Sequence, residues 1–184
     1  MKIRRITTAE APTGVVTQTD EVFDTSTVQD LTHAFDIWGF DEVPELPLRP
    51  EHVLGEYKEL GLFGPRGGIR VDIQVVPPVL GDEPPDLSAI AGNLNFGTGG
   101  GMTPGTEGAG MHRTDTVDFV VVLEGETNVA YPGEDGTVHE ITIKAGDFLT
   151  HNGTFHRWHN RSAANCTLML IPIAATRHAE ETPG

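Results

Sequence analysis

The sequence predicts an all-β domain of the sandwich or barrel class, and three observations carry that prediction. From residue 117 onward, short β-branched and aromatic runs recur at eight-to-twelve-residue spacing, separated by glycine-containing turns. Segment 69–76 alternates strictly between apolar and polar residues, as a half-buried strand does, and Pro77-Pro78 ends it. Helical pattern is confined to one short piece, 50–60, which has a proline at its first position and an acid in its first turn.

The remaining elements follow in chain order. Segment 14–24 is expected to hold a first strand pair and 31–40 a further strand, whereas 41–68 is an arm on the surface that carries the short helix. Segment 79–110 is a long loop rich in glycine and proline, either a lid over a site or a connector. The strands expected after it are 117–123, 127–131, 138–143, 148–151, 155–159 and 167–173. A polar tail from residue 174 is expected to fray.

Composition limits the partners. The chain has 184 residues, enough for one domain with extensions, and its formal net charge is −15 with only 12 Lys and Arg. That charge excludes nucleic acid and anionic membrane surfaces as expected partners, and leaves a small molecule and a second copy in a homodimer. Cys166 lies in an apolar run, where a buried, inert thiol is expected. No 18-residue apolar run appears, so we expect a cytoplasmic protein.

Ionisable residues gather on one predicted strand face. Alternation of side chains places five even-numbered residues on the same side: His112, Thr114, Thr116, Asp118 and Val120. In the second half of the chain, His156, Trp158 and Asn160 share a face, with His159 on the other. If both strands line one cavity, His112, Asp118 and His156 converge there.

Two motifs in this region resemble those of the cupin superfamily, over roughly residues 105–175. The first runs from His112 through Asp118 to Gly125, with Thr114 where the family has a second histidine and Asp118 where it has glutamate. The second comprises Gly146, His151, Gly153, His156 and Asn160, with the family's spacing from Gly153 onward. The string His-Arg-Thr-Asp-x-x-Asp is similar to that of a small single-cupin subgroup lacking that second histidine.

The resemblance implies a cupin double-stranded β-helix, or jelly-roll, barrel with an N-terminal extension and the long Gly/Pro-rich loop. It implies three parts of one structural domain: 1–104 packing on the barrel, 105–175 forming the barrel core, and 176–184 as a frayed tail. The family's motif residues hold Fe, Zn, Mn or Ni inside the barrel. Here His112, Asp118 and His156 are the candidate ligands, and two imidazoles with one carboxylate suffice for iron or zinc. No nucleotide cofactor is expected.

Structural roles compete with these functional ones. Trp158 is more often barrel core than a platform for substrate. His151 replaces the family's proline at a turn and is expected to be exposed or at the cavity rim, where it joins Thr114 and Trp158 as a substrate-binding candidate. Asp118 is costly if unpaired, so a metal or a protonated histidine is expected beside it, because Arg113 faces the other way. Four histidines are expected at the surface: His33, His52, His139 and His178.

Several functions fit this site, with His112, Asp118 and His156 as the candidate catalytic residues. The first is a lyase or dehydratase, isomerase or cyclase acting on a small oxygenated metabolite, of the kind found in secondary metabolism. It would use either a metal as Lewis acid or histidine and aspartate as acid and base. A non-haem metal-dependent oxygenase and a non-catalytic cupin that binds a small molecule are the alternatives, since the fold alone cannot choose between them.

Overall fold

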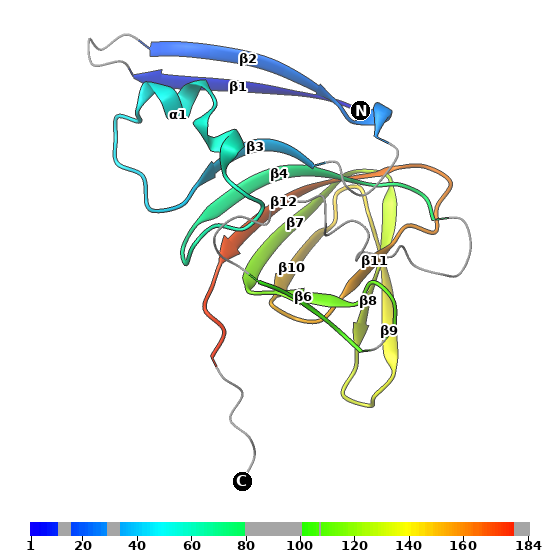
Figure 1. The fold of residues 1–184 in the computed structure, drawn as a ribbon. Helices are drawn as coiled ribbons and strands as arrows, with labels where there is room; N and C mark the ends of the chain where they lie inside the picture. Colours follow the sequence, from blue (N-terminus) through cyan, green and yellow to red (C-terminus); the bar gives the residue numbers. More distant parts are fainter. Residues whose placement is uncertain (11–15, 29–33, 80–100, 107, 179–184) are drawn as a thin grey trace.

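A computed structural model of the chain describes residues 1–10, 16–28, 34–79, 101–106 and 108–178. Within these residues the strands form two facing antiparallel sheets and two smaller strand pairs (Figure 1). The five-stranded sheet has the order β10 (Phe148–Asn152), β7 (Thr116–Glu124), β12 (Cys166–Ala174), β4 (Ile69–Val76) and β3 (Ala34–Phe40). The three-stranded sheet has the order β11 (Arg157–His159), β8 (Glu126–Pro132) and β9 (Val138–Lys144). The all-β prediction is therefore confirmed.

A single apolar cluster joins the two sheets. Val120 and Leu168 from the larger sheet pack with Val129 and Ile143 from the smaller one, and three further residues complete the cluster: Val76, Val122 and Cys166. Along β7 from Thr116 to Leu123 the even positions are buried and the odd positions are half-buried, as the strand period predicts, and Glu124 at its end is exposed. The Cys166 thiol is fully buried, and burial raises its pKa to about 12, so the predicted inert thiol is confirmed.

The larger sheet extends beyond the segment that the motifs cover. Strand β4 pairs along its length with β12, from Cys166 opposite Val76 to Ile173 opposite Ile69, and β3 pairs in turn with β4. The predicted strand at 69–76 has the bounds of β4. Part of segment 1–104 thus belongs to the barrel sheet itself instead of packing against it.

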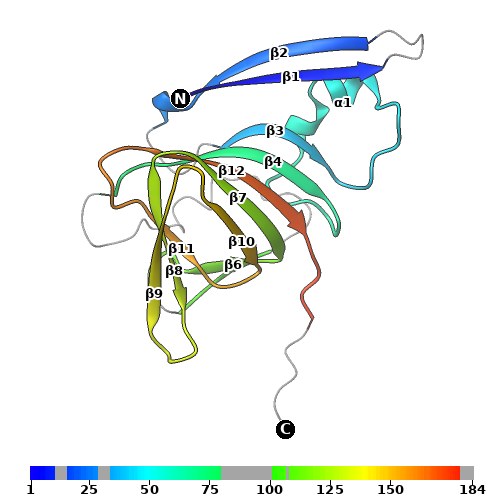
Figure 2. The same cartoon turned by 180° about the vertical axis from the view of Figure 1, so that it is seen from behind.

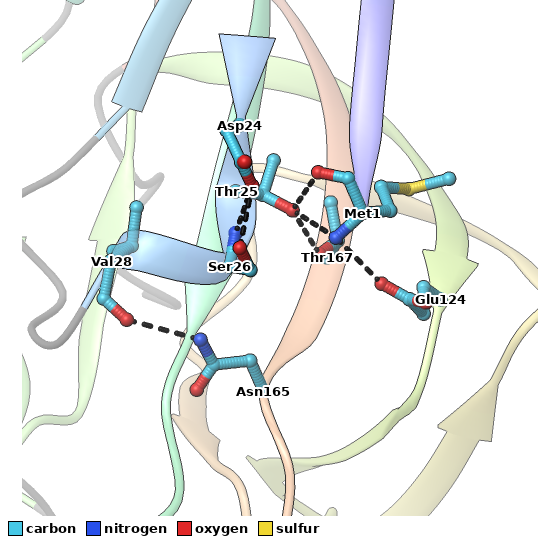
Figure 3. Close-up of polar contacts among 8 residues, drawn as sticks. All are labelled: Met1, Asp24, Thr25, Ser26, Val28, Glu124, Asn165 and Thr167. Carbon is cyan, nitrogen blue, oxygen red and sulfur yellow. Dashed lines mark hydrogen bonds and ion pairs between the residues drawn. The ribbon is translucent and has the colours of Figure 1, made fainter.

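A hairpin of β1 (Lys2–Glu10) and β2 (Val16–Asp24), followed by the 3-10 turn η1 (Thr25–Thr27), lies on the β3–β4 side of the larger sheet, away from β8 and β9 (Figure 2). Side-chain hydrogen bonds join the end of the hairpin that holds Met1 and Thr25 to the start of β12 (Figure 3). Thr25 Oγ1 donates to the Met1 carbonyl at 3.0 Å and accepts from Thr167 Oγ1 of β12 at 3.4 Å. Asn165 Nδ2 donates to the Val28 carbonyl at 3.0 Å, which ties the end of η1 to the start of β12.

The short helical segments pack on β3 through aromatic rings. Helix α1 (Pro50–Leu54) begins at the predicted proline, and the 3-10 turn η2 (Glu56–Glu59) follows it. The His52 ring stacks on Phe40 at 4.8 Å, and the Trp38 and Tyr57 rings lie 4.7 Å apart. The expectation of a surface His52 is wrong, because its apolar ring neighbours bury it to 9% exposure. His139 and His178 are exposed as predicted, and His33 lies outside the described residues.

The predicted loop at 79–110 is interrupted near its end. Strand β5 (Met102–Pro104) pairs with β6 (His112–Thr114). Residues 80–100 lie outside the described part of the chain, so the choice between a lid and a connector stays a prediction. The tail beyond 174 is not wholly frayed: Arg177 Nε donates to Asp115 Oδ1 at 2.7 Å, and Arg177 Nη2 donates to the Gly153 carbonyl at 2.9 Å. Residues 179–184 also lie outside the described part.

Candidate active site

Two strand ends bring the first pair of histidines together. His112 opens β6, and His156 immediately precedes β11. Their backbones exchange two hydrogen bonds, from the His112 N–H to the His156 carbonyl at 2.9 Å and in reverse at 2.8 Å. The ring centroids lie 4.6 Å apart. The predicted convergence of His112 and His156 is present because this bridge pins both residues side by side.

His151 completes a cluster of three imidazoles. Its ring stacks on His156 with centroids 4.0 Å apart and an angle of 18° between the planes. The expected position at an exposed turn is wrong: His151 lies inside strand β10 and is 6% exposed, because β10 continues through it before the turn at Gly153. The other half of that expectation holds, since His151 lines a cavity.

Backbone carbonyls fix the tautomers of the first two histidines. Nδ1 of His112 lies 2.9 Å from the Gly110 carbonyl oxygen, and Nδ1 of His156 lies 2.9 Å from the Thr154 carbonyl oxygen. A carbonyl oxygen only accepts hydrogen bonds, so each Nδ1 carries the proton and each Nε2 presents its lone pair. His151 Nε2 is buried with no hydrogen-bond partner. His112 and His156 therefore each present an Nε2 lone pair, and His151 adds a buried Nε2 that has no hydrogen-bond partner.

Asp118 lies opposite His151 across the β7–β10 ladder. Residues directly opposed in an antiparallel pair point to the same face with Cβ atoms about 5 Å apart. Asp118 is 7% exposed, and its Oδ1 has no hydrogen-bond partner. Thr114 and Thr116 lie beside it, with their hydroxyl oxygens 2.6 Å apart. Asp118 thus lies beside the histidine cluster, on the face of the strand that the sequence predicts.

Burial sets the protonation states of this cluster. It lowers the pKa of His156 to about 3 and that of His151 to about 4, and neighbouring imidazoles add to both effects. Burial also lowers the pKa of His112. The same burial raises the pKa of Asp118 to about 6, opposed by hydrogen bonds from Thr116 and Thr114. A protonated histidine beside Asp118 was the wrong expectation, because desolvation keeps these rings neutral and favours the neutral carboxylic acid.

A cavity of about 510 Å³ opens on this cluster through His151. Six apolar side chains line it: Val129, Tyr131, Pro132, Ile141, Leu149 and Phe155. Arg113, Gly153 and Thr154 complete the lining. Arg113 was not a candidate, since strand parity turns it away from His112 and Asp118. Its place in the lining follows from the chain's course: β6 is a short strand that pairs with β5 on one edge and bridges to His156 on the other, and Arg113 lies between these contacts with its side chain on the opposite face from His112. No pattern in the sequence indicates that Arg113 and Phe155 come together at this cavity.

Other motif residues are structural. Trp158 is partly buried, packs against the core cluster and meets the His151 ring edge-on at 5.8 Å, so it contributes to the core, and its role in substrate binding stays a prediction. Asn160 is fully buried, donates to the carbonyls of Val76 and Ala164 at 2.7 and 2.8 Å, and does not face the cluster. Gly125 has a φ of +79°, and a Cβ there would lie 2.5 Å from the Asn165 carbonyl oxygen. Side chains other than hydrogen do not fit at that turn.

Three neutral imidazoles and a carboxylate are a donor set that zinc or iron accepts. In the arrangement described, however, no three His, Cys, Asp or Glu side chains among the described residues are grouped so as to hold one ion. Two of the rings are stacked face to face instead of pointing at a common centre. The side chains as placed do not fit a metal, so binding by His112, Asp118 and His156 stays a prediction and no step below passes through a metal.

The two facing sheets, with the first motif on β6 and β7 and the second on β10 and β11, identify the architecture. This is a cupin fold. Cupin structures with similar folds include oxalate oxidase bound to glycolate (14% identity, 58% of this chain, 42% of that chain, TM-score 0.36) and vicilin from Solanum lycopersicum (13%, 59%, 23%, 0.37). Fe(II)-HppE with the alternative substrate (S)-1-HPP also matches, at 12% identity over 57% of this chain and 42% of that chain, with a TM-score of 0.37. The strand topology and the motif residues, not these scores, carry the assignment.

Similar sequences come from fungal biosynthetic clusters. Phomopsin biosynthesis cluster protein C' of Diaporthe leptostromiformis is 39% identical over 61 residues, which are 33% of this chain and 30% of that protein. Oryzines biosynthesis cluster protein J of Aspergillus oryzae is 43% identical over 51 residues, 28% of this chain and 26% of that one. The chain spans less than a third of the length of these relatives. No family model matches the chain. None of the helices in the described residues has the length and apolar character to cross a membrane.

Proposed function

We propose that this cupin is an enzyme that removes and returns protons on a small oxygenated metabolite, as a dehydratase or isomerase. One observation carries the proposal: a buried, neutral His151 with an unpaired Nε2 lies directly opposite a buried Asp118 with an unpaired Oδ1. Unpaired buried groups are costly and concentrate at functional sites. Association of the similar sequences with biosynthetic clusters is consistent with a metabolite as substrate.

The two groups are suited to opposite halves of one reaction. His151 stays neutral down to a pH of about 4, so its Nε2 lone pair accepts a proton from the carbon next to a carbonyl group. Asp118, with a pKa of about 6, keeps a proton that an ordinary aspartate loses, and donates it to a leaving hydroxyl group. The carbon–oxygen bond breaks, a carbon–carbon double bond forms, and water leaves. A proton passed from His151 to Asp118, its neighbour, restores both groups.

The other histidines support the base. His156 stacks on the His151 ring and holds its own proton on Nδ1 through the Thr154 carbonyl. It thereby sets the ring orientation of His151, and the His112 ring contacts His156 in turn, with centroids 4.6 Å apart. The mostly apolar cavity lining excludes water from the reacting atoms. The acid is therefore Asp118 in this proposal and not a second histidine, because burial lowers the pKa of all three imidazoles and so leaves them without the extra proton that an acid must give.

Proton exchange in heavy water tests this proposal without knowledge of the natural substrate. A panel of β-hydroxy ketones and β-hydroxy acids is incubated with the protein in D2O and followed by NMR for deuterium at the α-carbon and for alkene signals. We expect His151→Gln to abolish both signals. Asp118→Asn should keep deuterium exchange and lose water elimination, because only the acid is removed. His139→Gln, a change at an exposed histidine, is the matched control.

Two outcomes would count against the proposal. Exchange that survives His151→Gln and His156→Ala places the base elsewhere, and ligand binding without any exchange indicates a binding protein. Metal content is measured in parallel on protein purified without a histidine tag. Near-stoichiometric metal that His156→Ala removes would support the predicted metal site and replace the proton-transfer account.

A further inference from the structure

We infer that Arg177, in the C-terminal tail, is a positioning residue that holds together the two backbone segments carrying the histidines and Asp118. This inference rests on the proposed function, in which His151 and Asp118 act on one substrate. It adds a residue that acts on these two groups through the backbone around them.

The two segments run beside each other between two fixed points. At one point β10 ends its pairing with β7 at Asn152. At the other, the backbones of His112 and His156 exchange their two hydrogen bonds. Residues 113–116 of one segment and 153–155 of the other lie between these points. The alignment of the cluster therefore depends on what joins the segments in this interval.

The guanidinium of Arg177 joins them there. Its Nη2 donates to the Thr114 carbonyl at 3.0 Å and to the Gly153 carbonyl at 2.9 Å. Its Nε donates to Asp115 Oδ1 at 2.7 Å, in an ion pair whose side chains are both partly exposed. A guanidinium carries several donors fixed in one plane, so one side chain can hold three acceptors in a set geometry. Asp115 balances its charge and fixes its orientation.

The segments approach most closely at Gly153. This residue has a φ of +64°, and a Cβ there would lie 2.8 Å from Arg177 Nη2 and 3.3 Å from the Thr114 carbonyl oxygen. A side chain at this position would therefore displace the guanidinium, in addition to straining the turn. The glycine of the second motif thus leaves room for Arg177 between the two segments.

The atoms that Arg177 holds lie next to the groups that the proposed reaction uses. Gly153 follows His151 by two residues and lines the cavity. Thr114 is a hydrogen-bond partner of the Asp118 carboxyl group. His151 and Asp118 lie one pair from the end of their ladder, where strands open most readily. A contact just beyond that end restrains both groups.

The tail reaches this place because it continues the path of β12. Ala174, the last residue of β12, lies opposite Thr116. The Ala175 N–H then donates to the Asp115 carbonyl at 2.9 Å. Two residues later Arg177 contacts the same segment through the Asp115 side chain. The contact therefore extends the pairing of β12 with β7.

Arg177→Ala tests the inference with two independent readouts. The first is kcat and KM for α-carbon exchange in D2O, with the best substrate of the β-hydroxy ketone and β-hydroxy acid panel. We expect kcat to fall by about 10- to 100-fold and KM to change by less than about threefold, because misalignment affects the chemical step. The second is amide hydrogen exchange by NMR at the His156 N–H, which donates to the His112 carbonyl. This amide should exchange about tenfold faster or more.

Two further variants separate positioning from folding. Arg177→Lys keeps the charge near Asp115 but replaces the planar fork with a single ammonium group, so it should restore part of kcat. Asp115→Asn should reduce kcat less than Arg177→Ala does, and the double variant should lose little more than Arg177→Ala alone, because both changes act on one contact. The control is Arg4→Gln, which removes an exposed guanidinium that pairs with Asp20 on the β1–β2 hairpin. It should leave both readouts unchanged.

Unchanged kcat together with unchanged amide exchange in Arg177→Ala would overturn the inference. So would a loss of kcat that follows a fall in melting temperature, or one that Arg177→Lys does not partly restore. If the unaltered protein shows no α-carbon exchange, the proposed function fails, whereas faster amide exchange at His156 in Arg177→Ala still supports the role of the contact. If α-carbon exchange is present and Arg177→Ala alters neither readout, the proposed function stands and this inference alone fails.

Discussion

Asp118 and His151 face each other across the β7–β10 ladder, and each keeps one buried polar atom without a hydrogen-bond partner. Burial shifts their pKa values past each other, up to about 6 for the acid and down to about 4 for the base, so both groups are neutral between these values. An acid and a base that are neutral together can move a proton in one step without first creating a buried charge. The predictions below follow from this pair.

The pH profile for the rate of water elimination should be bell-shaped. His151 must be neutral to accept a proton, so activity is lost as the pH falls through about 4. Asp118 must be protonated to donate, so activity is lost as the pH rises through about 6. A pH profile of kcat/KM between 3 and 9 checks this, and a plateau that extends to pH 9 would show that Asp118 is not the acid.

Removing a hydrogen bond to Asp118 should shift the upper pH limit of activity. The hydroxyl of Thr116 lowers the pKa of Asp118, more so than that of Thr114. Thr116→Val keeps the shape of the side chain and deletes the hydroxyl, so the pKa of Asp118 rises and activity persists to higher pH, by roughly half a unit to one unit. Thr142→Val, at an exposed hydroxyl on β9, should leave the profile unchanged.

Single changes in the cluster should separate catalysis from folding. Asp118→Asn keeps the shape of the side chain but cannot donate a carboxyl proton, so kcat should fall by about 10²–10⁴-fold. His151→Gln should cost a similar factor through loss of the base. Circular dichroism and the melting temperature report folding in the same samples. A loss of activity that tracks loss of melting temperature would assign these residues a structural role instead.

The architecture was predictable from sequence, and much of the site was not. The alternation along β7 and the bounds of β4 follow from local patterns, because strand period is a property of consecutive residues. The burial of His151 depends on β10 pairing with β7, and the place of Arg113 in the cavity lining depends on how β6 pairs with β5 and bridges to His156. Both depend on contacts between residues that lie far apart in the sequence. No local pattern distinguishes a histidine in a turn from one that stacks on a residue across a barrel.

Acid should destabilise the fold through the histidines. In the unfolded chain these imidazoles take up protons below pH 6.5, whereas in the folded chain His156 and His151 do so only near pH 3 and 4. The unfolded state therefore binds more protons below pH 6.5, and the free energy of unfolding falls as the pH drops, by on the order of 5 kcal/mol at pH 4.5 for the two histidines together. Asp118 acts in the opposite sense. Denaturant unfolding at a series of pH values in this range measures the effect. The free energy of unfolding should depend less steeply on pH in His156→Leu and more steeply in Asp118→Asn.

A second buried carboxyl group should limit stability at high pH. Asp72 is 2% exposed and lies opposite Asp36 across β3 and β4, and burial, with a contribution from Asp36, raises its pKa to about 8. The folded chain thus keeps a proton that the unfolded chain releases above about pH 4, so stability falls as the pH rises from 4 to 8. Asp72→Asn should raise the melting temperature at pH 9 by roughly 4–8 °C, for ~2 kcal/mol, and much less at pH 5.

The pKa values of Asp118 and His151 are the most direct test of the account. NMR titration of ¹³C-labelled carboxyl groups and of histidine ring protons gives both in the absence of substrate, with Asp118→Asn and His151→Gln to assign the signals. The account predicts that Asp118 titrates near pH 6 and His151 near pH 4. An Asp118 that titrates below pH 4, or a His151 that titrates above pH 6, would contradict it.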